Sequence, residues 1–195
     1  MKHCSHEIHA PMVGCLRRIF GLGLLGLGLA AALSGAPALS AKDASKPAIA
    51  VLPFEIEDTS GEVGQSARHE NNLATITRYV GEEIADKGIY SVVPQSEVAK
   101  AVADVNSGTY LRSCNGCEFD IAKAVGADRV LIGWFYKVST LIGTLHIVVK
   151  DVPTGKTVYA HVFDFRGDNE KAWRRAAGYM IRSLDKRTRQ ESTTN

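Results

Sequence analysis

The sequence predicts an α/β protein with a mixed five-stranded sheet and helices packed on its faces. Two observations predict this fold class. Apolar segments typical of buried strands alternate with segments of helical periodicity, and three further strand-like segments follow one another with only short turns between them. Strands joined by helices pair in parallel through right-handed crossovers, whereas strands joined by tight turns pair antiparallel. We therefore expect the strand order 2-1-3-4-5, with the last three strands as an antiparallel meander.

The first 41 residues have the pattern of a secretion signal peptide. Arg17 and Arg18 precede an uncharged apolar segment over 19–33, and small residues follow it up to Ala41. The apolar segment contains four glycines and is shorter than the roughly 20 residues that a membrane-spanning helix needs. We therefore expect cleavage near Ala41, no stable membrane anchor afterwards, and a periplasmic or secreted protein.

The remaining chain is expected to form a single α/β domain over 48–185, between a polar lead-in over 42–47 and a disordered polar tail over 186–195. The whole sequence contains 23 lysine and arginine residues and 21 aspartate and glutamate residues. Such a balance argues against a nucleic-acid partner, because phosphate binding needs clustered positive charge. A basic cluster near the C-terminus, from Arg174 to Arg189, is most simply a solvated helix face.

The first half of this domain alternates strands and helices. The nearly continuous apolar segment 48–56 predicts a strand buried on both faces, with Pro53 near its end because proline lacks an amide hydrogen. The glycine-rich segment 58–70 predicts a loop, and 89–93 a short second strand. Between them, apolar residues at helical spacing predict a helix that Gly88 ends: Leu73, Ile76, Val80 and Ile84.

Two shorter helices come next. Ser96 can cap the first of them, and a loop over 106–116 separates it from the second, which ends at Gly126. The meander strands are expected over 130–138, 141–152 and 158–165, with a turn at 153–156. A last helix, capped by Asp168, carries one apolar stripe of Trp173, Ala177, Met180 and Leu184.

Several short motifs resemble known families. Val51-Leu52-Pro53-Phe54, Val125-Gly126-Ala127-Asp128 and Asp151-Val152-Pro153-Thr154-Gly155 resemble the amino-terminal domain of TolB and related periplasmic modules. A closer resemblance is to an uncharacterised family of predicted secreted bacterial proteins, a domain of unknown function. It is carried by Cys114-Asn115-Gly116-Cys117, Lys137-Val138-Ser139 and Arg166-Gly167-Asp168 with Trp173-Arg174-Arg175. The resemblance implies a TolB-like fold and a role in binding.

Cys114 and Cys117 are the cysteines that remain after signal cleavage. A structural disulfide is the favoured interpretation, because an exported protein enters an oxidising compartment. A redox pair at a helix start remains an alternative, as does half of a metal site. The sequence offers no second cysteine pair to complete a zinc site.

Two histidines and several aromatic residues are expected on the meander. If Val152 pairs with Thr157, His146 and His161 share one sheet face, where they could contribute to a metal site or simply be solvated or covered by a helix. The same register predicts one aromatic face, made of Tyr159, His161 and Phe163, with Trp134 and Tyr136 alternating similarly on the neighbouring strand. This face is either a partner surface or the core beneath the last helix.

Catalysis and nucleotide binding find little support. The sequence has no Gly-x-Ser-x-Gly nucleophile motif, and Thr154-Gly155-Lys156-Thr157 lacks the first glycine of a phosphate-binding loop because position 150 is lysine. We therefore expect no catalytic residues, no cofactor and no dedicated metal ligands.

The sequence thus favours an exported, non-enzymatic binding module for another envelope protein or envelope component. The loops 58–70 and 106–117 are the expected contact region, because open α/β sheets bind ligands at the carboxyl ends of their parallel strands. A small-molecule or thiol-disulfide redox accessory centred on Cys114 and Cys117, and a metal-binding accessory protein using His146 and His161, remain alternatives.

Overall fold

A computed structural model describes residues 46–105, 108 and 110–194 of the chain. The expected signal peptide over 1–41 lies outside these residues. Within them, no helix combines the length and the apolar character needed to cross a membrane.

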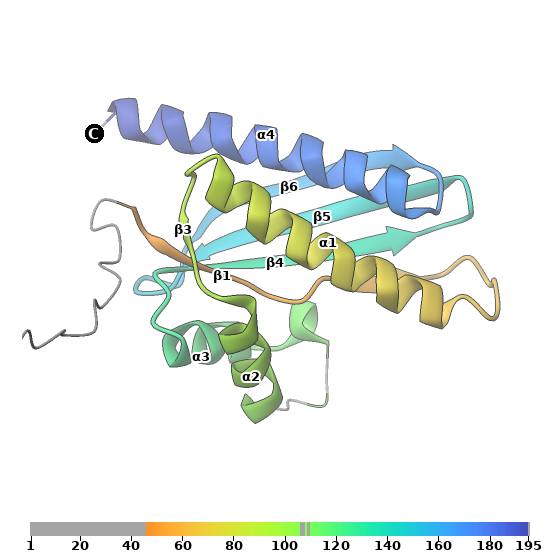
Figure 1. The fold of residues 1–195 in the computed structure, drawn as a ribbon, viewed down its shortest axis with the longest axis horizontal. Helices are drawn as coiled ribbons and strands as arrows, with labels where there is room; N and C mark the ends of the chain where they lie inside the picture. Colours follow the sequence, from red (N-terminus) through yellow and green to blue (C-terminus); the bar gives the residue numbers. More distant parts are fainter. Residues whose placement is uncertain (1–45, 106–107, 109, 195) are drawn as a thin grey trace, which may run out of the picture. The chain divides into compact units, whose positions relative to one another are not determined.

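The sheet has the predicted strand order (Figure 1). The strands lie in the order β3 (Ser91–Val92), β1 (Ala48–Val51), β4 (Arg129–Lys137), β5 (Ile142–Asp151) and β6 (Thr157–Arg166). β1 pairs in parallel with both β3 and β4, and β4, β5 and β6 form the antiparallel meander. The mixed α/β fold class expected from the sequence is confirmed.

The first expected strand is split into two segments. β1 pairs with the start of β4, and β2 (Glu55–Asp58) pairs in parallel with its end. Three residues over 52–54 lie opposite two residues of β4, so the chain bulges where Pro53 cannot donate a ladder hydrogen bond. The Phe54 amide instead donates to Thr77 Oγ1 over 2.9 Å. The Phe54 ring lies against Gly133, where any Cβ would overlap it.

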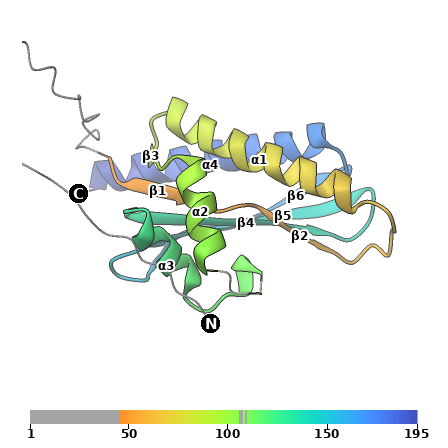
Figure 2. The ribbon, with the colours of Figure 1, turned by 60° about the horizontal axis from the view of Figure 1, so that its bottom comes forward.

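Helices cover the two faces of the sheet unequally. α1 (Ser66–Asp86) and α4 (Glu170–Thr194) pack side by side on one face, α1 against β1, β2 and β3 and α4 against β5 and β6. α2 (Gln95–Val105) and α3 (Cys117–Ala124) lie on the opposite face, as Figure 2 shows, where they pack against β1 and the beginning of β4. A 3-10 turn, η1 (Leu111–Ser113), connects α2 to α3.

Both long helices differ from expectation at their ends. α1 begins at Ser66, inside the expected loop 58–70. Asn169, rather than Asp168, caps α4, because its Oδ1 accepts a hydrogen bond from the Ala172 amide over 3.0 Å. α4 also continues to Thr194, through the tail that we expected to be disordered. Ion pairs four residues apart support this extension, Arg189 with Asp185 and Arg187 with Glu191.

The predicted register of the last hairpin is wrong by two residues at the turn and by one residue along the rest of the two strands. Lys150, not Val152, lies opposite Thr157, and an irregularity follows between Val149 and Lys150. Because side chains alternate along a strand, a shift of one residue exchanges the two faces of the sheet. His146 lies opposite Val162, whereas His161 lies opposite Ile147. The two histidines therefore lie on opposite faces.

Candidate functional site

The residues of the expected aromatic partner surface do not form one surface. Tyr159 and Phe163 are 9% and 6% exposed and belong to the core beneath α4. Trp134 packs on the opposite face, beside the cluster around α2 and α3, and Tyr136 shares its face by strand alternation. His161 is exposed on β6 and lies against the Phe163 ring at a centroid distance of 4.4 Å.

His146 is held by its neighbours on the face opposite His161. Its ring stacks on Trp134 at a centroid distance of 4.7 Å, and Nε2 lies 2.8 Å from Thr144 Oγ1. Burial lowers the pKa of His146, and the Glu57 carboxylate only partly opposes that effect. A metal site shared by His146 and His161 is excluded by their placement on opposite faces.

The cysteine pair lies where η1 leads into α3. The Cys114 and Cys117 sulfur atoms lie within bonding distance, with their Cα atoms 5.7 Å apart. The adjacent Glu118 carboxylate lies within 4.8 Å of both sulfur atoms, so these three residues form a group that could hold a metal ion. However, one Glu118 oxygen accepts from the Gly116 amide and the other pairs with Lys150 Nζ at 2.7 Å. Both carboxylate oxygens are thus already engaged by protein donors.

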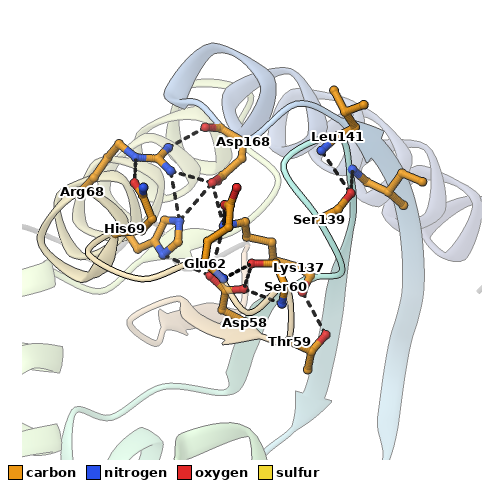
Figure 3. A network of polar contacts seen from close by, with 12 residues as sticks. Asp58, Thr59, Ser60, Glu62, Arg68, His69, Lys137, Ser139, Leu141 and Asp168 are labelled. Atoms are coloured by element: carbon orange, nitrogen blue, oxygen red, sulfur yellow. Dashed lines mark hydrogen bonds and ion pairs between the residues drawn. The ribbon is translucent and has the colours of Figure 1, made fainter.

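A buried charged cluster lies at the carboxyl end of β4 (Figure 3). Lys137, the last residue of β4, has a side chain that is only 4% exposed. Its Nζ lies 3.1 Å from an Asp58 oxygen, 2.6 Å from a Glu62 oxygen and 3.1 Å from an Asp168 oxygen. The ammonium thus joins the end of β2, the loop before α1 and the loop before α4.

Two residues of the first turn of α1 complete this arrangement. Arg68 Nη2 pairs with Asp168 Oδ2 at 2.6 Å, and Nη1 donates to the Asp168 carbonyl oxygen. His69 Nε2 lies 3.2 Å from the same Oδ2, and the His69 ring stacks on Trp173. We call these six residues the Lys137 cluster: Asp58, Glu62, Arg68, His69, Lys137 and Asp168.

The charged states in the cluster stabilise one another. Burial alone would lower the pKa of Lys137, but hydrogen bonds to Glu62, Asp168 and Asp58 raise it above its ordinary value. Burial alone would raise the pKa of Asp168, but hydrogen bonds from Arg68, His69 and Lys137 lower it. The pKa of Asp58 is lowered as well: burial opposes this, and hydrogen bonds from Ser60 and Lys137 outweigh it.

An open pocket of about 840 Å³ lies beside the cluster, and we call it the loop pocket. Most of its lining comes from the segment 54–73, including Asp58, Glu62 and His69 of the cluster, and Tyr110 closes it from the second loop. Val63 and Tyr110 are 89% and 58% exposed. The expected contact loops, 58–70 and 106–117, therefore meet at this pocket.

Glu55 on β2 holds the second loop in place. Its carboxylate accepts hydrogen bonds from the Leu111 amide at 2.6 Å and the Arg112 amide at 3.1 Å. The same carboxylate pairs with the Arg112 guanidinium at 3.2 Å, and this guanidinium lies 3.9 Å from the centre of the Tyr110 ring. Tyr110 is thus presented on an anchored segment.

The Lys137 cluster was not predicted from the sequence, although the sequence contains a signal for it. Lys137 continues the alternation of Leu131, Gly133 and Phe135, which all face the core beneath α1 and α4. A lysine at such a position is almost never buried without a partner. An aspartate just before a helix is equally typical of a helix cap, so its position does not indicate the role of Asp168 in the cluster.

Comparisons with solved structures found similar folds at low sequence identity. The carboxy-terminal domain of LpoB from Salmonella enterica is 16% identical with a TM-score of 0.42, over 61% of this chain and 82% of that one. Lipoprotein GNA1162 from Neisseria meningitidis is 16% identical with a TM-score of 0.45, over 64% and 83%. TolB from Acinetobacter baumannii is 14% identical with a TM-score of 0.39, over 70% of this chain but only 26% of TolB.

A comparison with curated proteins found no match to this chain. The comparison with family profiles matches residues 47–184, which is most of the chain outside the expected signal peptide. The chain therefore belongs to the DUF3280 family, which is described as "Protein of unknown function (DUF2380)".

Proposed function

We propose that this protein is an exported, non-enzymatic module that binds another protein of the bacterial envelope through the loop pocket. The observation that carries the proposal is the pair of exposed side chains, Val63 and Tyr110, at a pocket whose lining includes three residues of the Lys137 cluster. Large side chains next to a concave, rigid surface are typical of the anchor points of protein interfaces.

The backbone of the first loop favours this presentation of Val63. Gly61 and Gly64 have φ angles of +75° and +76°, which residues with a side chain rarely adopt. Apart from the adjoining residues of the chain, no atom lies within 4 Å of where a Cβ would stand at either glycine. Open space and left-handed glycines on each side of Val63 therefore support a contact role for it rather than a role in the core.

The ionisation of the Lys137 cluster argues against acid–base catalysis. A general acid or base works best when its pKa lies near the working pH. The pKa values of Asp58 and Asp168 are lowered and that of Lys137 is raised, so each is driven away from neutrality. These groups are suited to holding the pocket in shape.

A photo-crosslinking amino acid placed at position 63 or 110 tests this function in cells. We expect both positions to form an adduct with the same envelope protein. The same probe at Glu82, whose side chain is 60% exposed on α1, should form none. With that partner purified, Val63→Asp should weaken binding at least tenfold without changing the melting temperature. Equal adducts from all three positions, or none from 63 and 110, would contradict the proposal.

We also propose that the protein is exported and that its signal peptide is cleaved near Ala41. The segment 1–41 should be absent from protein recovered from the periplasm or medium, which amino-terminal sequencing measures.

We propose that Cys114 and Cys117 form a structural disulfide that braces η1 against α3, and not a redox centre. Thiol alkylation and mass measurement, with and without reductant, should show both thiols protected until reduction, and rapid turnover with a physiological thiol donor would favour the redox alternative.

A further inference from the structure

A second open groove, of about 860 Å³, lies between the two long helices. We call it the α1–α4 groove. Tyr79 contributes from α1, and the other lining residues belong to the first half of α4. Its charged and aromatic lining is dominated by six residues: Tyr79, Lys171, Arg174, Arg175, Tyr179 and Arg182.

The four cations of this groove have no carboxylate partner among the residues that the structure describes. Further along the same helix the situation differs, because Arg187 pairs with Glu191 and Arg189 with Asp185. Glu170 is the acidic residue in the lining. The groove therefore carries excess positive charge, in a chain whose net charge is only +2.

Aromatic rings hold two of the arginines in position. The Arg174 guanidinium lies 4.5 Å from the centre of the Tyr79 ring, and the Arg182 guanidinium lies 5.6 Å from that of Tyr179. A guanidinium on an aromatic ring keeps its N–H groups available at its edge, where they can bind a carboxylate with two parallel hydrogen bonds. These arginines are thus partly ordered before any ligand arrives.

Gly178 lets the Tyr79 hydroxyl and the Arg182 guanidinium lie close to the α4 backbone. A Cβ at this position would lie 3.2 Å from the Tyr79 hydroxyl and 3.6 Å from Arg182 Nη1. A glycine inside a helix costs about 1 kcal/mol of helix stability relative to alanine. The glycine in the middle of α4 therefore lets both side chains line the groove, at a cost in helix stability.

We propose that the α1–α4 groove binds an acidic segment of a partner protein, whose carboxylates pair with Arg174 and Arg182. Eight residues of helix separate the two arginines, which corresponds to about 12 Å along the axis. Carboxylates four residues apart on an extended peptide are separated by about 13 Å, which matches this spacing. A groove between two helices fits a chain better than a flat lipid surface. The site is separate from the loop pocket and does not depend on its role.

Fluorescence anisotropy with a labelled peptide of ten glutamates tests this proposal on the mature protein. We expect binding that weakens with added salt, and no binding of a peptide of ten glutamines. Arg174→Ala combined with Arg182→Ala should weaken glutamate binding at least tenfold. The matched control, Arg187→Ala with Lys100→Ala, removes two exposed charges elsewhere and should weaken it less than twofold.

Gly178→Leu gives a test that leaves every charge in place. The added side chain should occupy the groove and weaken peptide binding at least fivefold, while circular dichroism and the melting temperature show an intact fold. Equal losses in the arginine pair and its control would overturn the proposal, because they would indicate general charge attraction. Groove-dependent binding of phosphatidylglycerol vesicles without binding of the peptide would also overturn it, in favour of a lipid site.

Discussion

Replacing Lys137 by methionine keeps much of the side-chain length and removes the ammonium from the Lys137 cluster. Three carboxylate oxygens, within 3.1 Å of Nζ, then lose their shared partner. Removing one partner of a buried ion pair typically costs about 3–5 kcal/mol. Glu62 and Asp58 have side chains 34% and 21% exposed and can regain water, whereas Asp168, at 5%, keeps Arg68 and His69. We therefore expect Lys137→Met to lower the free energy of unfolding by about 3 kcal/mol, the lower end of that range.

Urea denaturation at pH 7, followed by circular dichroism, measures this loss. Lys87→Met is the matched control, because Lys87 is 39% exposed and pairs with Glu83 at 3.4 Å. It should change the free energy of unfolding by less than about 0.5 kcal/mol. A loss below about 1 kcal/mol for Lys137→Met would refute the reasoning, since it would mean that the three carboxylates are hydrated in the native protein.

Three further predictions concern Asp168, Gly133 and Asn169. The lowered pKa of Asp168 means that its stabilising charge is present above the ordinary value of 3.8 and is lost as the pH falls through the native value. Urea denaturation between pH 2 and 7 should therefore show wild-type stability falling below about pH 4, and a flatter profile for Asp168→Asn. Gly133→Ala should cost about 1–3 kcal/mol in the same assay, because its Cβ overlaps the Phe54 ring, and an unchanged midpoint would show that the ring moves freely. Asn169→Ala should cost about 1 kcal/mol through loss of the α4 cap, and an unchanged stability would disprove the cap assignment.

The strand order was predictable because it depends on long, redundant patterns. The apolar segment at 48–56 and the short turn after Asp151 each leave one reasonable pairing, and the crossover rule then orders the strands. Errors of one residue did not disturb this result, since neighbouring apolar residues supply the same signal.

Details that rest on a single residue were less predictable. The register of the last hairpin depends on one irregularity beside Lys150, and this places His146 and His161 on opposite faces. The choice between Asp168 and Asn169 as the helix cap depends on a shift of one residue, because both side chains are good caps. The Lys137 cluster depends on contacts between residues far apart in the sequence, which no local pattern reports.

That separation along the chain has a kinetic consequence. Arg68 and Asp168 are 100 positions apart, so their contact closes a long loop. The entropic cost of closing that loop is offset only once most of the sheet has formed. The Lys137 cluster should thus form after the transition state of folding. Weakening it should accelerate unfolding and leave the refolding rate nearly unchanged, so the cluster governs how long the native state persists rather than how quickly it is reached.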